Sequence, residues 1–208
     1  TYAYSEIFQR NINTKFDRTK NYRGAVNYTY AAREKSIEPF KNIQFIKKSK
    51  ALKLLQEFNF NLIPSQISFQ NEVLRNYRER QNRTITAAGG NNFIFDSPAF
   101  FQKNFNWTRR YTIRHNFTKS LSLNFNATNQ ALIGEPEGRV SKDEAEAYDR
   151  WKNQIWGNIK SFGQTTNYNH SFDLTYQIPI NKFPGLDFVT ANTSYSGTFA
   201  WDVVGDPE

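Results

Sequence analysis

Over residues 105–131 the chain alternates strictly between apolar and polar side chains, and this pattern limits its fold more than any other feature. In the stretch FNWTRRYTIRHNFTKSLSLNFNATNQA every apolar residue stands at an odd position. Successive side chains of a β-strand point to opposite faces, so the pattern predicts a β-hairpin that turns at TKS. One face of this hairpin is apolar and the other is polar. The apolar face has to be covered by a protein core or by lipid.

Further runs with a period of two predict six more strands, which makes about eight in all. They cover residues 2–13, 21–31, 56–63, 66–78, 167–178 and 187–202. Several of these runs are about 12–15 residues long, whereas globular strands average about 5–6 residues and membrane-spanning strands need about 9–11. Strand length therefore favours lipid as the cover of the apolar face.

The connections between these predicted strands differ in length. Three are short, with the sequences PSQ, TKS and PINKFPG, and three are long, at residues 32–54, 79–104 and 133–166. Short and long connections alternate along the chain, as do the periplasmic turns and extracellular loops of outer-membrane barrels. We therefore predict an all-β fold: the wall of an antiparallel up-and-down transmembrane β-barrel, with residues 133–166 as a long extracellular loop.

In such a wall the apolar side chains contact lipid and the polar side chains line an aqueous pore. The residues expected to face lipid are Phe105, Trp107, Tyr111, Ile113, Phe117, Leu121, Leu123, Phe125, Phe172, Leu174 and Tyr176. The residues expected to line the pore are Asn106, Thr108, Arg110, Thr112, Arg114, Asn116, Ser122, Asn124, Asn126 and Thr128.

Composition agrees with this fold class. Mean hydropathy is −0.74, and no run of about 18 apolar residues occurs, which excludes a transmembrane helix but not strands of alternating character. Phe, Tyr and Trp make up 16% of the residues, which argues against disorder in so polar a chain. The absence of Cys excludes disulfides and thiolate metal sites. The net charge of +8 fits an acidic partner and a wet, cationic channel wall equally well.

The long loops have patterns of their own. We predict a helix over about residues 142–156, because Ser141 and Glu144 match a capping box, and one helical face carries Tyr148, Trp151, Ile155 and Ile159. Gly157 or Gly163 is expected to end this helix. A Phe-rich loop at 93–101 and the helix supply the expected docking residues for a partner: Phe100, Phe101, Trp151 and Trp156. Residues 47–57 fit a short basic helix or the approach to a strand equally well.

The sequence contains no G-x-S-x-G, no H-E-x-x-H and no Gly-rich phosphate loop, so we expect no enzyme activity, no cofactor and no metal. The acidic residues between 135 and 146 are expected in a solvated loop, and His115 and His170 as packed side chains. Nucleic acid is not an expected partner. Arg110 and Arg114 lie opposite the aromatic face, whereas proteins that bind single strands place rings and cations on the same surface.

Two arginines interrupt the apolar face. Arg75 and Arg109 stand at odd-numbered positions, as do the apolar residues of their strands. A cationic side chain facing lipid costs about 2–4 kcal/mol at the bilayer midplane and about 0–1 kcal/mol near the interfaces. Each arginine lies close to a long-loop end of its strand, so we expect both at the outer interface. Otherwise a partner protein or a shift in register has to cover them.

Three stretches resemble the SprA/Sov family, the giant outer-membrane translocons of the type IX secretion system in Bacteroidota. These stretches are LLQEFNFNLIPSQISFQNEVLRNYRERQNR, FQKNFNWTRRYTIRHNFTKSLSLNFNATNQALIGEPEG and YQIPINKFPGLDFVTANTSYSGTFAWD. The resemblance covers most of the chain after about residue 38, with Phe188 in a position where Trp would be expected.

The resemblance implies a very large single-chain barrel in the Gram-negative cell outer membrane. This barrel would conduct folded proteins to the cell surface and serve gliding motility in some species. The implied partners are the rest of the same giant barrel, a smaller outer-membrane barrel (PorV-like), a periplasmic plug protein, secreted cargo proteins and lipid.

Two alternatives remain open at this point. One is a secreted or surface β-sandwich that binds glycans or peptides through its Tyr and Trp residues. The other is a complete eight-stranded membrane barrel. The chain starts in a strand-like segment and ends in a Gly-Asp-Pro turn, so we expect it to be an internal fragment of a longer barrel. That expectation, and a polar face rich in long side chains, count against a narrow complete barrel.

Overall fold

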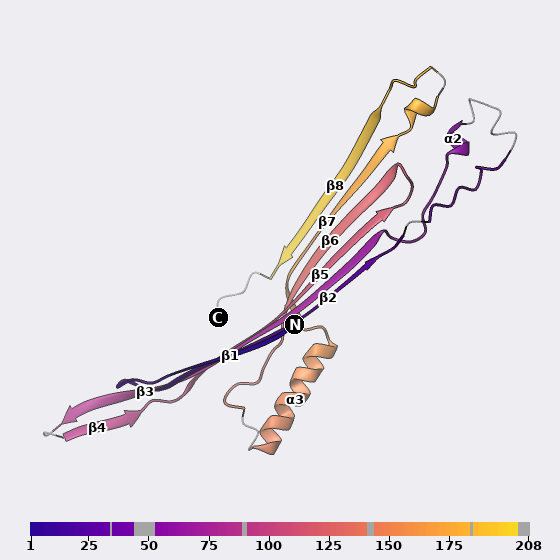
Figure 1. Ribbon diagram of the computed structural model, residues 1–208. Coiled ribbons are helices and arrows are strands. Elements are labelled where there is room, and N and C mark those ends of the chain that lie inside the picture. The colour runs from indigo at the N-terminus through magenta and orange to yellow at the C-terminus, as the bar shows by residue number, and fades with distance from the viewer. Residues whose placement is uncertain (34, 44–52, 89–90, 141–143, 184, 204–208) are drawn as a thin grey trace.

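The computed structural model describes residues 1–33, 35–43, 53–88, 91–140, 144–183 and 185–203. Its strands form one antiparallel sheet in the order β1-β2-β3-β5-β6-β7-β8, with β4 paired to β3 alone (Figure 1). The strands are β1 (Tyr2–Gln9), β2 (Thr14–Ala31), β3 (Gln66–Ala88), β4 (Asn91–Asp96), β5 (Phe100–Asn116), β6 (Leu121–Leu132), β7 (Gln164–Ile178) and β8 (Ala191–Asp202). The helices are α2 (Lys53–Gln56), α3 (Ala145–Lys160) and the short 3-10 helix η2 (Ile180–Lys182).

The all-β prediction is confirmed, and the hairpin that dominates the sequence pattern is present as β5 and β6. Trp107 lies opposite Ala131, and Ile113 lies opposite Phe125, so the apolar residues of both strands share one face. The turn between the strands is stabilised by Thr118, whose hydroxyl oxygen accepts hydrogen bonds from the Ser120 and Leu121 amides at 3.1 and 2.9 Å.

The sheet is a single layer over most of its area. Among the described residues, no large side chain is fully buried, and the buried apolar residues are Tyr77, Ala127, Ala131, Ile133 and Ile155. The last of these belongs to α3, which lies beside the sheet near one end, whereas α2 lies near the opposite end (Figure 1). A β-sandwich would need two sheets packed face to face, and all the described strands belong to one. None of the described helices is both long and apolar enough to cross a membrane.

The strands extend further toward the α3 end than predicted. β2 begins at Thr14, and the segment predicted as a loop at 79–104 is instead the end of β3, strand β4 and the start of β5. Charged pairs replace the apolar alternation in these extensions: Arg78 donates two hydrogen bonds to Asp17, at 3.0 and 2.6 Å, and Lys15 pairs with Asp96. A strand with polar residues on both faces leaves no period-two signal, so the prediction missed it.

The strand predicted over residues 56–63 is wrong. Only one isolated bridge, between Ile37 and Phe60, forms there. The Asn residues of the alternating pattern face the protein instead: the Asn59 side-chain oxygen accepts from the Lys119 amide at 2.7 Å, and the Asn61 amide side chain donates to the Asn116 carbonyl at 2.7 Å. The segment therefore packs on the β5–β6 turn through its polar side, and Phe58 and Leu62 stay exposed.

The loss of that strand also overturns the predicted alternation of short and long connections. The connection from β2 to β3, residues 32–65, is long and lies at the same end of the sheet as the short β5–β6 turn. Of the ambiguous stretch at 47–57, residues 53–56 form helix α2, and residues 47–52 lie outside the described residues.

The predicted helix in the 133–166 loop is confirmed and is longer than expected at its C-terminal end. Ser141 of the capping box lies outside the described residues, and Glu144 occupies the N-cap without a side-chain hydrogen bond. Gly157 lies inside α3, whereas Gly163, with a φ of +70°, follows its end and donates its amide to the Asn158 carbonyl at 2.7 Å. The C-cap of the helix is Ser161, followed by Phe162 with a φ of +63°, whose amide donates to the Ile159 carbonyl at 3.0 Å. Of the two glycines, Gly163 is therefore the one that belongs to the helix end.

The two glycines give a matched test of this end of α3. A Cβ at position 163 would lie 2.9 Å from the Leu132 carbonyl oxygen, and the left-handed conformation itself costs a non-Gly residue about 1–2 kcal/mol. Gly163→Ala should therefore speed hydrogen exchange at the α3 amides. Gly157→Ala meets nothing within 4 Å and should slow exchange, because Ala stabilises a helix by about 0.5–1 kcal/mol relative to Gly. If both variants changed the hydrogen exchange of α3 in the same way, the assigned helix end would be wrong.

Candidate functional site: an apolar face and a polar face

One face of the sheet is apolar across its strands. Residues that lie opposite each other in the register share a face. One such row crosses β2 to β8 as Tyr28, Phe69, Tyr111, Ala127, His170 and Phe199. Every residue predicted to face lipid belongs to this face by its place in the alternation, and all but one of these residues lie in strands. Phe117 lies in the β5–β6 turn, where its ring packs against His115 with ring centroids 4.2 Å apart.

The opposite face is polar over the same strands. One row of it runs as Asn27, Gln70, Arg110, Thr128, Asn169 and Ala200. All the residues predicted to line a pore belong to this polar face by their place in the alternation. Hydrogen bonds between strands join some of them, such as the 3.0 Å bond from the Thr112 hydroxyl to the Asn126 side-chain oxygen. The two predicted sets are therefore separated by the sheet itself.

Much of the apolar face is uncovered in the described part of the chain. Exposed fractions reach 64% for Val26 and 57% for Tyr28 near one edge of the sheet, and 67% for Tyr195 and 51% for Phe199 near the other. Soluble monomeric proteins rarely expose contiguous apolar patches of more than a few hundred Å². This face is therefore a surface built to contact lipid or another protein.

The segment from residue 133 to residue 163 covers the apolar face at one end. The connection leaves β6, carries α3, and returns to β7 at Gln164. The sequence predicts residues 133–166 as a long extracellular loop and leaves open how this loop packs. The segment folds back onto the strands, where Ile155 of α3 and Ile133 are buried.

Arg75 is held under this segment by Glu135. The guanidinium donates two hydrogen bonds to the carboxylate, at 2.6 and 2.7 Å, and the two side chains are only 19% and 2% exposed. The Trp151 indole donates a third hydrogen bond to Glu135 at 3.1 Å. Rings surround the guanidinium, whose carbon lies 5.4–5.7 Å from the ring centroids of Tyr22, Tyr77 and Trp151.

Arg109, which is 6% exposed, is held by the same segment. Its guanidinium donates to the Asn129 side-chain oxygen at 2.6 Å and to the Phe162 carbonyl at 3.0 Å. Its guanidinium carbon also lies beside two rings that stack on each other, 4.6 Å from the Trp107 centroid and 5.3 Å from that of Phe162. The chain's own loop therefore covers both arginines. The sequence predicts them at an outer interface, with a partner protein or a register shift only as the alternative cover.

The prediction of a solvated acidic loop is wrong for Glu135. Burial raises the pKa of this carboxyl, but hydrogen bonds from Arg75 and Trp151 and the charges of Arg75 and Lys103 lower it further, so its net pKa lies below the usual value. Asp143 lies outside the described residues, and Glu137, Glu144 and Glu146 are exposed. An ion pair between residues 60 positions apart leaves no local sequence signal.

The predicted docking residues occupy different environments. Phe100 and Phe101 lie in β5, paired with Arg80 and Glu79, and not in a loop as predicted. Trp151 points toward the sheet as part of the Arg75 cluster, whereas Trp156 is 54% exposed. The helical face that carries Trp151 therefore holds α3 on the sheet, and Trp156 is the one of the two that is open to a partner.

The two histidines are packed among rings, as expected. His170 stacks on Phe199 with centroids 5.4 Å apart and an interplanar angle of 25°, and it also contacts the Phe125 ring. Within the part of the chain that the structure describes, no group of three or more metal-ligating side chains comes together.

Comparison with known proteins adds no assignment. No protein-family model matches the chain, and no curated protein sequence matches it significantly. The resemblance to the SprA/Sov family therefore stays a prediction.

Replacing the carboxylate under α3 tests the ion pair. Glu135→Gln leaves the guanidinium of Arg75 without its counter-charge, and breaking a buried ion pair on one side costs about 3–5 kcal/mol. We expect faster hydrogen exchange in α3 and cleavage of the 133–163 segment by added protease. Glu137→Gln, an exposed change in the same loop, should alter neither readout. A Glu135→Gln variant as protected as wild type would show that the pair does not hold the loop.

The lowered pKa of Glu135 also predicts a pH dependence. The folded carboxyl releases its proton more readily than the unfolded one, whose pKa is near 4.5. Its contribution is therefore complete above about pH 4.5 and is lost as the pH falls through the folded pKa. Exchange protection of α3, corrected for the intrinsic rate, should fall in this acidic range in the wild type. If Glu135→Gln showed the same acid-dependent loss, the loss would come from another group.

Proposed function

We propose that this chain is part of the wall of a transmembrane β-barrel in the Gram-negative outer membrane, with its apolar face against lipid. The observation that carries the proposal is a single-layer sheet whose apolar face is contiguous over the strands and largely uncovered, while the opposite face is polar. Proteins that bury one face of a sheet inside a core cover it with a second layer. Here lipid takes the place of that layer.

The height of the apolar band supports lipid over a protein partner. On β7 the apolar positions run from Tyr168 to Ile178. At about 3.3 Å per residue this is about 33 Å along the strand, or about 25 Å in height for a strand tilted by about 40°. Outer-membrane barrels have an apolar band of about 25 Å. The buried arginines, Arg75 and Arg109, lie toward the α3 end, where the strands go on into charged pairs.

In this proposal α3 and the β3–β4 extension lie on the outer side of the membrane. The long strand extensions then stand in water, where the Asp17–Arg78 pair and the other charged pairs are hydrated. The turn at 117–120 and the connections at 32–65 and 179–190 lie on the periplasmic side.

The resemblance to the SprA/Sov family extends the proposal to a specific function. The wall would belong to the protein-conducting channel of the type IX secretion system, which passes folded proteins to the cell surface and is linked to gliding motility. Its lining of Asn, Thr, Ser and Gln side chains is hydrated by water and offers folded cargo few apolar patches to adhere to. The wall itself carries out no chemistry, so the energy for export comes from other components.

The chain would be one sector of a larger barrel. Among the described strands, β1 and β8 are the two ends of the sheet order and do not pair with each other. An open strand edge in a bilayer leaves unpaired backbone groups that cost several kcal/mol each, so both edges need further strands. The rest of the same giant barrel would supply them. The alternative, a binding module of the β-sandwich type, lacks the second sheet among the described residues.

Labelling two neighbouring residues of β6 tests the membrane wall. Single Cys residues at Leu123 and Asn124 are placed in the intact protein, from which any other Cys has been removed, and each carries an environment-sensitive fluorophore. We expect a lipid-soluble quencher to act at position 123 and iodide at position 124, because the two side chains lie on opposite faces. If lipid-soluble quenchers reached neither position, the membrane proposal would fail.

A further inference from the structure

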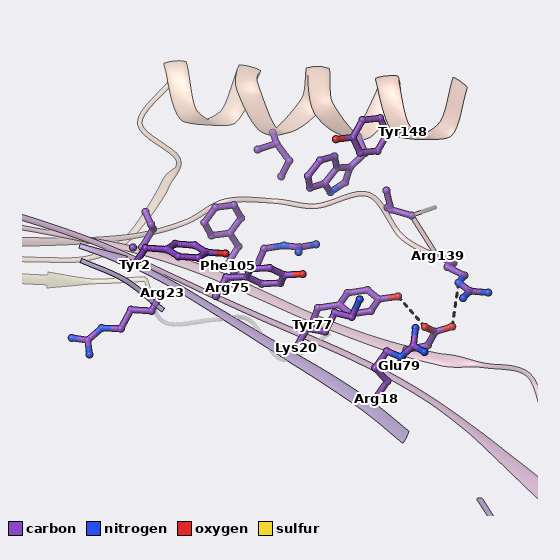
Figure 2. Close-up of a pocket in the computed structure, with 16 residues that line it drawn as sticks. Tyr2, Arg18, Lys20, Arg23, Arg75, Tyr77, Glu79, Phe105, Arg139 and Tyr148 are labelled. Carbon is purple, nitrogen blue, oxygen red and sulfur yellow. Dashed lines mark hydrogen bonds and ion pairs between the residues drawn. The ribbon is translucent and has the colours of Figure 1, made fainter. Parts of the chain in front are cut away.

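A cavity of about 650 Å³ lies between α3 and the strands beneath it, at the level where the apolar face ends (Figure 2). We call it the α3 groove. Its wall on the helix side carries Tyr148, Trp151 and Ile155, and its floor is formed by residues of β2, β3 and β5. Pockets that hold small molecules typically have volumes of about 300–1,000 Å³. The α3 groove is therefore large enough for a ligand headgroup.

The polarity of the groove changes along its floor. One row of the register is largely aromatic and runs as Tyr4, Tyr22, Arg75 and Phe105. The next row toward the α3 end carries Lys20 opposite Tyr77, and the row after that carries Arg18 opposite Glu79. Figure 2 shows Arg18, Lys20 and Tyr77 on the strands and Tyr148 under α3, on the side of the helix that faces the strands. The groove is thus apolar on the side of the membrane band and cationic on the outer side.

The cations of the groove exceed the carboxylates. Arg75 is neutralised by Glu135, and Arg139 lies 3.6 Å from Glu79, but no carboxylate of a described residue lies within 4.0 Å of the Lys20 ammonium. The Arg18 guanidinium forms an ion pair with Glu6, with 3.4 Å between Nε and the carboxylate oxygen. Glu6 also lies directly opposite Lys20 in the register, so Lys20 and Arg18 share one carboxylate and this side of the groove keeps a net positive charge.

An exposed apolar strip continues from the groove toward the opposite end of the sheet. It follows β1 and β2 and consists of Tyr4, Val26 and Tyr28, which are 47%, 64% and 57% exposed. A ligand with an anionic head in the groove could lay its acyl chains along this strip. The volume of the groove and its change from an apolar to a cationic side match an amphiphile that stands upright in the outer leaflet.

We propose that the α3 groove binds the phosphate-bearing headgroup of an outer-leaflet lipid, with Lys20 and Arg18 contacting the phosphate and Tyr148 and Trp151 covering the sugar or glycerol part. This inference rests on the proposed membrane wall and adds a specific lipid site to it. Charge-assisted hydrogen bonds to phosphate give the selectivity, and aromatic rings at the interface give the apolar contact.

Native mass spectrometry of the intact protein in detergent tests the site. The probe is bis-phosphorylated lipid A, compared at equal concentration with the same lipid after removal of both phosphates. We expect retention of the phosphorylated form to be about tenfold stronger, and Lys20→Glu to abolish most of that preference. Lys20→Arg should keep it. Lys160→Glu, which makes the same charge change on the exposed end of α3 outside the groove, should leave it unchanged.

The outcomes separate the possible sources of phosphate. Equal retention of both lipids, or a preference that Lys20→Glu does not change, would overturn the proposal. Displacement of lipid A by millimolar inorganic phosphate would also overturn it, because the groove would then bind a small anion only. If this lipid A test failed while the lipid-soluble quencher still acted at position 123, the groove would not be a lipid site, but the membrane wall would stand. Failure of both tests would remove the wall itself.

Discussion

The apolar side chains of one sheet face have to be kept from water, and the described residues cover that face at one end only. Elsewhere Val26, Tyr28, Tyr195 and Phe199 remain more than half exposed. A sheet of this kind is stable only in an environment that supplies the missing layer. The bilayer that we propose in that position would account for the strand length, for the pairing of charged residues beyond the apolar band and for the polar opposite face.

The covered end shows how the fold tolerates cations on the apolar side. Arg75 and Arg109 lie on the same face as the residues proposed to contact lipid. The 133–163 segment places a carboxylate on Arg75 and a backbone carbonyl on Arg109. Aromatic rings of Trp107, Trp151 and Phe162 shield both guanidinium groups. The arginines therefore fasten α3 to the sheet. That attachment in turn creates the groove whose outer rim is cationic.

The sequence was informative wherever a strand has one apolar and one polar face. The β5–β6 hairpin, β7 and the separation of the two residue sets were predicted because alternation with a period of two has few other causes. The extensions at 14–20 and 79–84 were missed, because nearly all of their residues are polar, so neither face stands out as apolar. Residues 56–63 were wrongly predicted as a strand for the opposite reason. Their apolar and polar residues do alternate, but Asn59 and Asn61 bind the neighbouring turn. The Arg75–Glu135 pair depends on folding and could not be predicted from spacing.

We propose that the two faces of this sheet meet two different solvents. A scan of β7 by site-directed spin labelling, one residue at a time from position 167 to position 178 in the intact protein in lipid, tests it most directly. The account predicts that collisions with oxygen, which concentrates in lipid, peak at the even positions from Tyr168 to Ile178. Collisions with a water-soluble nickel chelate should peak at the odd positions from Asn167 to Gln177. Accessibility without this alternation, or oxygen maxima at the odd positions, would contradict the account.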